Sequence, residues 1–451
     1  MGRRLAAAAM AAGIAAVAVT TAGCGDGGSG DANTIKIAYQ KFGNFIQGDA
    51  LFKKVKTQFE AANPGKKVTL VPIQGNDADY KTKLALMQRS AATAPDVLYE
   101  DTFTINSDIQ AGYLAPLDSY VNKWADWSQF LPASKGSATG TDGKVYGVPM
   151  GTDTRALWFN KQIFAKAGLP ADWQPKTWAD ILAAARTIKA KVPGVIPLNV
   201  YVGKAGGEQS SMQGHEMLLY GTANKLYDDK TKKWIAPSKG FTDALNFEKT
   251  IYSEGLAPSP QQALSPSIGT QVGGQLLPQG KLAIDLDGSW MPQTWLPTGA
   301  APWAQWSQVM GNAAMPTQNG EAPGKISMSG GWTLAMSAKS TNKDLAFKFI
   351  STAMNKENAL YYDISATQIP VRTDVASDPS YGKGDPTAKF FASLVPITQY
   401  RPALPPYPQI SNEIQVAQEA VVSGQATPDA AVQQYATAVK GIVGASAVAA
   451  G

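Results

Sequence analysis

Acidic side chains follow or interrupt several apolar segments of the sequence. These residues are Glu100, Asp101, Asp153, Asp285 and Asp287. Ionised carboxylates accept hydrogen bonds from neighbouring hydroxyl groups. Two carboxyl groups on either side of a glycosidic bond are also the acid and base of a glycosidase. The acidic residues alone therefore leave two interpretations open, a binding site and a hydrolytic site.

Other catalytic chemistry has few candidate residues in this chain. His215 is the only histidine, and no Gly-x-Ser-x-Gly motif accompanies it, so a structural role for His215 is favoured. The composition gives one cysteine, Cys24, which leaves no cysteine for a zinc site in the body of the protein. We expect no catalytic residues, no metal and no cofactor.

The elements that position the acidic residues alternate between strands and helices in the first 150 residues. Predicted strands are 34–38, 68–71 and 96–99, and predicted helices are 51–62 and 79–91. This order predicts a mainly parallel, doubly wound α/β sheet. Ligands bind beyond the carboxyl ends of strands in such sheets. The residues found there are Tyr39, Gln40, Phe42 and Asn44 after one strand, and Tyr99, Glu100, Asp101 and Thr102 at the end of another.

A second unit begins near residue 150, after the extended stretch 146–150. Thr177 begins a helix with Asp180 three residues later, a weak form of the capping box, and Thr427 with Pro428 begins the last helix. Further strands are predicted at 195–200 and 282–286. The segments 203–214 and 258–280 are rich in Gly, Ser, Pro and Gln, which indicates either loops over a ligand or plain surface connections.

The amino terminus has the pattern of a secretory signal. Arg3 and Arg4 precede a segment of small apolar residues that is too short for a good membrane-spanning helix. The segment ends in Thr21-Ala22-Gly23-Cys24, which resembles a bacterial lipobox, and a two-chain lipid on Cys24 would anchor the protein stably. The alternative is an ordinary signal peptide with an incidental cysteine. We expect residues 1–23 to be the signal, 24–32 a flexible tether, and the body to be a lipoprotein at the outer face of the cell membrane.

The charge distribution argues against a nucleic-acid partner. Charged residues make up 17% of the chain, the formal net charge is +5, and both signs are interspersed. No basic patch typical of nucleic-acid binding is evident, so we expect no nucleic-acid partner.

Several separate segments together resemble one family, the carbohydrate-binding lipoproteins of ABC importers, which includes maltose- and trehalose-binding proteins. The matching segments are 95–97, 111–117, 142–149, 157–161, 280–290, 330–335, 343–350, 370–372 and 407–410. The resemblance implies a two-lobed periplasmic-binding-protein-like fold with doubly wound sheets joined by hinge segments. It places the first lobe at 33–150 and 333–366 and the second lobe at 151–332 and 367–445.

The same resemblance implies a function. The protein would capture a carbohydrate, a di- or oligosaccharide, between its lobes and deliver it to membrane permease subunits, as a monomer and not as an enzyme. A sugar offers apolar faces and a rim of hydroxyl groups, so its site needs aromatic rings and polar partners. Trp290 and Tyr407 match aromatic positions of the family. Together with residues at strand ends and crossings, the candidate ligand-binding residues are Gln40, Asn44, Glu100, Asp101, Asp153, Asp287, Trp290, Gly331, Trp332, Arg372 and Tyr407.

Each of these residues also has a structural alternative. The aromatic rings could pack inside a lobe, the carboxylates could cap helices or pair with Arg155, and Arg372 or Arg401 could form structural ion pairs. Trp303 and Trp306 could form an extra wall of the site or cover the second lobe. Two other functions remain open, namely an exported glycosidase with a carboxylate pair and an ABC binding protein for a polyamine, peptide or metal chelate.

Overall fold

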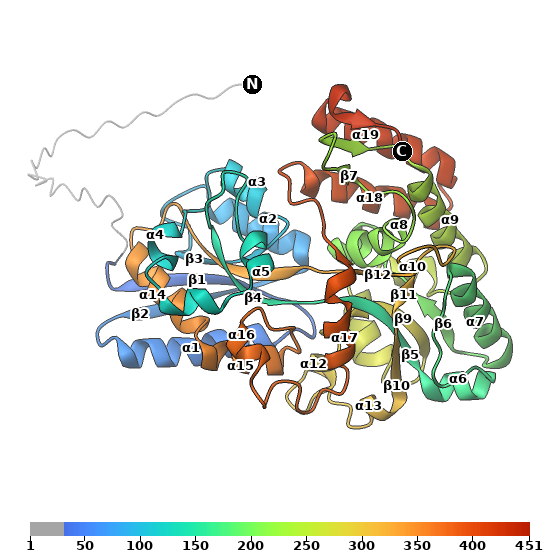
Figure 1. Ribbon diagram of the computed structural model, residues 1–451, viewed down its shortest axis with the longest axis horizontal. Coiled ribbons are helices and arrows are strands. Elements are labelled where there is room, and N and C mark those ends of the chain that lie inside the picture. The colour runs from blue at the N-terminus through green and yellow to red at the C-terminus, as the bar shows by residue number, and fades with distance from the viewer. Residues whose placement is uncertain (1–30) are drawn as a thin grey trace, which may run out of the picture.

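Two α/β lobes joined by extended crossings make up residues 31–451, the part of the chain that the computed structural model describes (Figure 1). The expected signal at 1–23, Cys24 and the tether up to residue 30 lie outside the described residues. The expected two-lobed α/β architecture is confirmed.

The first lobe is built on a five-stranded sheet. Its strands are β1 (Thr34–Lys41), β2 (Lys67–Gln74), β3 (Val97–Asp101), β4 (Gly147–Thr152) and β13 (Gly331–Met336). Their order in space is β2-β1-β3-β13-β4. β1 pairs in parallel with β2 and β3, whereas β13 runs antiparallel to β3 and β4. A strand from late in the sequence thus lies inside a sheet of early strands.

Side-chain alternation along β1 and β3 gives this sheet a core on each face. Ile37 and Val97 pack with α1 on one face, and Ala38 and Leu98 pack with α2 on the other. The helices of this lobe are α1 (Gln47–Ala62), α2 (Asp77–Met87), α3 (Ile105–Gln110), α4 (Asp118–Val121), η1 (Ala125–Gln129), α5 (Pro132–Ser137), α14 (Lys343–Ala353), α15 (Lys356–Ser365) and α16 (Thr373–Ala376). The sheet is therefore covered on both sides, as a doubly wound fold requires.

The second lobe has a four-stranded sheet of β5 (Arg155–Asn160), β6 (Ile196–Asn199), β9 (Leu282–Gly288) and β10 (Met310–Ala313), in the order β10-β5-β9-β6. Leu157 and Phe159 face one core, and Ala156 and Trp158 face another. Its helices are α6 (Lys161–Ala167), α7 (Trp178–Lys191), η2 (Lys204–Gly206), η3 (Gln209–Glu216), α8 (Met217–Leu219), α9 (Lys239–Ser253), α10 (Pro260–Ala263), α11 (Ile268–Gln271), η4 (Val272–Leu276), α12 (Pro292–Trp295), α13 (Trp306–Val309), α17 (Ala388–Leu394), η5 (Val395–Ile397), α18 (Tyr407–Val422), α19 (Pro428–Val443) and η6 (Ala445–Ala447).

Two small sheets complete this lobe. One contains β11 (Met315–Pro316), β12 (Lys325–Met328) and β14 (Thr398–Gln399), and the other contains β7 (Tyr227–Asp228), β8 (Lys233–Ile235) and β15 (Val448–Ala449).

Local capping explains where several helices begin. The capping box of α7 is complete, because Thr177 Oγ1 accepts from the Asp180 amide at 3.2 Å and Asp180 Oδ2 accepts from the Thr177 amide at 3.0 Å. Thr427 caps α19 with Pro428 in its first turn, as expected. α2 starts two residues earlier than the predicted Asp79, because the Asn76 side chain caps it.

The chain crosses between the lobes at the ends of paired strands. It leaves the first sheet at Thr152 and enters the second at Arg155, and it returns between Met328 and Gly331. The predicted boundary at residue 367 needs correction, because Val371 and Val375 belong to the core of the first lobe. Residues from about 387 onward join the second lobe, where Phe391 is buried.

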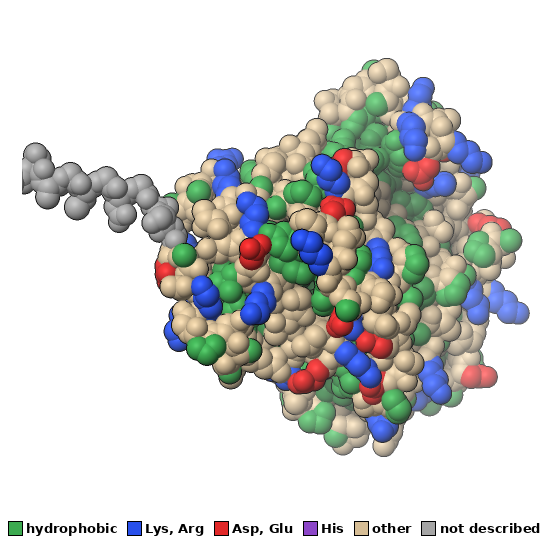
Figure 2. Space-filling view, turned by 60° about the vertical axis from the view of Figure 1, so that its left-hand side comes forward, with side chains coloured by type: hydrophobic (Ala, Val, Ile, Leu, Met, Phe, Trp, Pro, Cys, Tyr) green, Lys and Arg blue, Asp and Glu red, His purple; other side chains and the backbone are tan. Residues whose placement is uncertain are grey.

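The surface shows basic and acidic side chains interspersed on the face drawn in Figure 2, as the composition suggested. Among residues 31–451, no helix combines the length and apolar character needed to cross a membrane.

Candidate ligand-binding cleft

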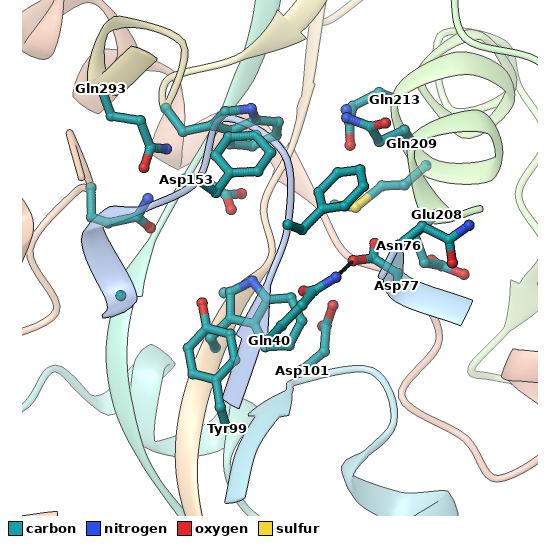
Figure 3. Close-up of a pocket in the computed structure, with 18 of the residues that line it drawn as sticks. Gln40, Asn76, Asp77, Tyr99, Asp101, Asp153, Glu208, Gln209, Gln213 and Gln293 are labelled. Carbon is teal, nitrogen blue, oxygen red and sulfur yellow. Dashed lines mark hydrogen bonds between the residues drawn. The ribbon is translucent and has the colours of Figure 1, made fainter. Parts of the chain in front are cut away.

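A cleft between the lobes collects side chains from both of them (Figure 3). Its space is about 1130 Å³ when the part open to solvent is included. The lining residues of the first lobe and the crossings are Gln40, Phe42, Phe45, Gly48, Phe52, Asn76, Asp77, Tyr99, Asp101, Asp153, Gly331, Trp332, Tyr362 and Gln368. Those of the second lobe are Arg155, Ala205, Gly206, Glu208, Gln209, Met212, Gln213, Trp290, Gln293 and Arg401.

The first lobe contributes residues from the carboxyl ends of its parallel strands, which meet at one edge of the sheet. Gln40 is near the end of β1, and Asp101 is the last residue of β3. Asp77 is the first residue of α2, and its Oδ1 accepts a 2.9 Å hydrogen bond from Gln40 Nε2 (Figure 3). The strand ends thus bring an amide and two carboxylates to one wall of the cleft.

Trp332 forms an aromatic wall with Tyr99. Their rings are stacked with centroids 4.2 Å apart and an angle of 6° between the planes. Gly331 precedes the tryptophan with φ of 151°, and a Cβ at that position would lie 2.6 Å from the Gly151 carbonyl oxygen. Glycine is therefore required where the return crossing passes close to β4.

Trp290 forms an aromatic wall on the second lobe. Its indole lies directly against Gly288, where a Cβ would overlap the ring. The Arg155 guanidinium carbon lies 4.7 Å from the ring centroid, a cation–π contact. The side chain is 9% exposed, and its Nε1 donor has no protein partner. Gly288 and Arg155 together fix the orientation of this ring.

Asp153 and Arg155 form a buried ion pair at the first crossing. Asp153 Oδ1 accepts from Arg155 and, at 2.8 Å, from the Gly330 amide of the return crossing. Burial lowers the pKa of the Arg155 guanidinium, although Asp153 opposes this shift. The pair ties the two crossings together at the base of the cleft.

Arg401 joins the two lobes across the cleft. Its Nη2 donates to Asp101 Oδ1 at 2.8 Å, and its Nη1 donates to Glu208 Oε2 at 3.0 Å. Burial raises the pKa of Asp101, whereas Lys81 and Arg401 overcome the effect of burial on Glu208 and hold its pKa below the usual range. A charged first-lobe residue is thus held by a second-lobe guanidinium in this conformation.

The structure places several expected ligand-binding residues on this cleft. They are Gln40, Asp101, Asp153, Trp290, Gly331 and Trp332. Five others do not line it. Asn44 lies between the lobes beside the cleft, where its Nδ2 donates to the Thr270 carbonyl at 3.2 Å.

Glu100 and Asp287 point away from the cleft into their lobes, which corrects their expected positions. Glu100 is adjacent to Asp101 in β3, so its side chain lies on the opposite face, where it accepts from Thr104. Burial raises its pKa, as does nearby Asp108. Asp287 accepts from the Tyr201 hydroxyl at 2.8 Å, and burial raises its pKa to about 6.

Arg372 and Tyr407 need the same correction. Arg372 belongs to the first lobe, where it pairs with Asp374 at 2.8 Å and Asp126 at 3.0 Å. Tyr407 is fully buried behind the cleft, and its hydroxyl hydrogen-bonds to Glu216 at 2.5 Å and Glu208 at 3.3 Å. Neither side chain lines the cleft, because nearby acidic groups hold each one elsewhere.

The sequence interpretation missed many lining residues, most of them amides and aromatic side chains. These are Phe45, Asn76, Asp77, Glu208, Gln209, Gln213, Gln293, Tyr362 and Gln368. One signal was available, because the polar segment 203–214 was noted as a possible loop over a ligand. It forms η2 and the π-helical η3, a form that is frequent at functional sites.

The residues considered for catalysis lie apart from the cleft or in ion pairs. His215 is fully buried beside Glu248, with Nδ1 3.2 Å from Oε1. Asp285 and Asp287 are buried in β9, and Asp101 and Asp153 are paired with arginines.

Trp303 and Trp306 pack on Trp295 and cover the second lobe. Among residues 31–451, no group of three potential metal-ligating His, Cys, Asp or Glu side chains occurs.

The class of protein follows from a family match. Residues 43–360 match the family described as bacterial extracellular solute-binding protein. The chain belongs to this family. A solute-binding protein of this family acts outside the cytoplasm, and the cleft between its lobes is the candidate solute site.

Individual relatives agree with this assignment. A protein of Brucella abortus strain 2308 is 25% identical over 92% of this solute-binding protein and 94% of its own length. The galactooligosaccharide-binding protein of Bacillus subtilis strain 168 is 25% identical and is covered over 78% of its length, with 79% of this chain. The solved GacH receptor of Streptomyces glaucescens is similar with a TM-score of 0.76 at 23% identity, covering 91% of this chain and 98% of that chain. The structural likeness shows the shared fold.

Proposed function

We propose that this protein captures a carbohydrate, a di- or oligosaccharide, between its lobes and delivers it to the permease of an ABC importer. One observation carries the proposal, namely that aromatic rings and polar groups from both lobes line a single cleft. Trp332 and Tyr99 supply apolar ring faces from the first lobe, and Trp290 supplies one from the second. Such faces match the apolar C–H surfaces of a sugar, and the surrounding amides and carboxylates match its hydroxyl groups.

The relatives support a carbohydrate as the solute. A galactooligosaccharide-binding protein and a lactose-binding protein are similar to this chain over 79% and 70% of its length. The GacH receptor, of the same fold, was solved in complex with acarbose. These ligands belong to those proteins, and we extend only their shared chemical class to this chain.

Closure of the lobes would be the capture step. Besides the Asp101–Arg401 pair, Gln47 Nε2 donates to the Gln293 carbonyl at 3.1 Å across the lobes. Hinge closure around a solute is a known mode of switching, and a ligand favours the closed form only through contacts made there. A sugar that touches Trp332 and Trp290 together would make such contacts.

We further propose that Cys24 carries a diacyl lipid and that the protein acts as a monomer at the outer face of the cell membrane. The small residues before Cys24 and the glycine-rich residues after it support the anchor. Gly- and Ser-rich sequences are typical of linkers, so an anchor at Cys24 would leave the lobes free to open and close near the permease.

A thermal-shift screen of neutral di- and oligosaccharides, followed by calorimetry, tests the proposal. We expect at least one sugar to raise the melting temperature and bind with one-to-one stoichiometry. If no sugar binds while a polyamine, peptide or metal chelate does, the carbohydrate proposal is wrong. Incubation with oligosaccharides should release no reducing ends, and steady turnover would indicate a glycosidase instead.

A further inference from the structure

We infer that the cleft selects carbohydrates without acidic groups, and that it accepts both neutral and amino sugars. This inference names the chemical class of the solute and rests on the proposed function.

The charges that line the cleft are predominantly negative. Four carboxylates, Asp77, Asp101, Asp153 and Glu208, stand against two guanidinium groups, Arg155 and Arg401. The lining therefore has a formal charge of −2 when all six groups are ionised. The whole sequence has a formal charge of +5, so the cleft is acidic on a basic protein. Charge gathered in a cleft raises the local concentration of ligands of opposite sign and lowers that of like sign.

Neither guanidinium is free to hold an acidic ligand. Arg155 is paired with Asp153 and also donates to the Met328 carbonyl at 3.2 Å. Arg401 is held by Asp101 on one side and Glu208 on the other. A phosphate or uronate that paired with either arginine would displace a buried carboxylate from its ion pair. An unpaired buried charge costs free energy, so such binding is unfavourable.

Lys81 is a basic residue near the cleft that does not line it. Its Nζ lies 3.7 Å from the centroid of the ring of Phe103, which follows β3 by two residues. Its charge contributes to holding the pKa of Glu208 down, so Lys81 acts on a protein carboxylate.

Asp77 differs from the other three lining carboxylates, because no guanidinium group of the described residues is paired with it. Within residues 31–451 it forms no salt bridge, and its Oδ1 accepts from the Gln40 amide. It is half-buried on the cleft wall. A hydroxyl or an amine of a sugar could donate to this carboxylate, whereas an acidic group would be repelled by it. A built-in repulsive group of this kind gives specificity by rejecting the wrong ligand.

Residues that line the cleft also supply hydrogen-bond donors for uncharged acceptors of a ligand. Gln213 Nε2 and Trp290 Nε1 are buried donors without a partner in the protein. The two residues are 4% and 9% exposed and line the cleft. A buried donor without a partner is unfavourable, and oxygen acceptors of a ligand would satisfy both groups. Hydroxyl and ring oxygens of a neutral sugar meet this need without adding charge.

The test compares sugars that share one skeleton. A neutral disaccharide found by thermal shift is compared by calorimetry with its uronic-acid and amino-sugar counterparts at low ionic strength. We expect the acidic counterpart to bind at least tenfold more weakly than the neutral sugar, and the amino counterpart to bind equally or more tightly. Added salt should reduce the difference in affinity between the acidic and the neutral sugar, because it screens the charges of the cleft.

Two matched variants locate the effect. Asp77→Asn keeps the hydrogen bond from Gln40 and removes the charge. We therefore expect the ratio of the affinities for the neutral and the acidic sugar, the penalty against the acidic sugar, to fall several-fold. Asp229→Asn removes an equal charge from the exposed turn between β7 and β8 and should leave the penalty unchanged. Circular dichroism and thermal melting confirm that both variants fold.

The possible failures are distinguishable. If no neutral, amino or acidic sugar binds, the proposed function fails. If an acidic sugar binds as tightly as its neutral counterpart, the proposed function stands and the inference about charge is overturned. An unchanged penalty in Asp77→Asn would show that Asp77 does not contribute to the selection.

Discussion

Asp101 and Arg401 meet across the cleft, with Oδ1 and Nη2 2.8 Å apart, although 300 residues separate them in the chain. Asp101 ends a strand of the first lobe, and Arg401 belongs to the second lobe, where Glu208 holds its other side. Nearby, Asn106 Nδ2 donates to the Ala403 carbonyl at 2.6 Å. The carboxyl end of β3 is therefore docked on the segment that precedes α18.

Asp101→Asn should weaken closure of the lobes. The amide lacks the negative charge, while Arg401 keeps its bond to Glu208. The substitution therefore removes only the ion pair between the lobes. We expect sugar binding to weaken at least tenfold, about 1.4 kcal/mol. Small-angle scattering of the unliganded protein should show a larger radius of gyration than for the wild type. Equal radii and equal affinities would show that the pair does not contribute to closure.

Trp290→Ala should weaken sugar binding by at least tenfold in calorimetry, because it removes the aromatic wall of the second lobe. Trp303→Ala is the matched control, since Trp303 packs on Trp295 outside the cleft lining. The control should retain affinity even if it melts at a lower temperature. Wild-type affinity in Trp290→Ala would exclude this ring from the site.

Gly288→Ala should displace the same ring without removing it. The new methyl group would overlap the Trp290 indole, so the side chain must rotate away from Arg155. We expect weaker sugar binding and a change in tryptophan fluorescence. Gly441→Ala in α19 adds a methyl group where no atom lies within 4 Å, and should keep full affinity with equal or greater stability.

The stability of the protein should depend on the protonation of Glu216. Burial raises the pKa of Glu216 to about 8 from a usual value of 4.5. Between those values the unfolded chain has lost a proton that the folded protein keeps, so the stabilisation is complete below pH 4.5 and is lost as pH rises toward 8. The contribution of this group to the free energy of unfolding should fall by up to about 1.4 kcal/mol per pH unit.

Urea denaturation of the wild type and Glu216→Gln at pH 5 and pH 8 measures this contribution. The variant should lose less stability over this range than the wild type. A variant with the same pH dependence as the wild type would show that Glu216 is not protonated in the folded protein.

Cys24→Ala should release the protein from the membrane fraction, because the variant has no thiol to which the lipid could be attached. Metabolic labelling with a fatty acid should mark the wild type and not the variant. Sugar affinity of the released protein should equal that of the wild type without its lipid. Retention of Cys24→Ala at the membrane would contradict the proposed anchor.

Strand ends explain how much of the cleft could be predicted from the sequence. Gln40 and Asp101 follow the carboxyl ends of parallel strands, and this topology can be inferred from local patterns. Trp290 and Trp332 were suggested by the glycines beside them and by the family resemblance. Local signals of this kind also predicted the caps of α7 and α19.

Residues whose position depends on distant partners were predicted less well. Arg372 looked available for a ligand, but Asp126, 246 residues earlier, holds it in the first lobe. Tyr407 is buried because Phe103 of the first lobe packs on its ring with centroids 5.4 Å apart. Glu100 and Asp101 are adjacent in sequence, and only the register of β13 on β3 shows which one faces the cleft. No local pattern contains this information.

The position of β13 between β3 and β4 constrains the order in which the protein can fold. A growing chain that has not yet reached Met336 lacks an inner strand of its first sheet, and β4 then has no neighbour to pair with. The first lobe therefore cannot complete itself early and independently, as an amino-terminal domain usually does during synthesis. Such late completion of the sheet leaves the first lobe unfinished until β13 has been made, and an incompletely folded chain is the state that can be threaded through a narrow export channel.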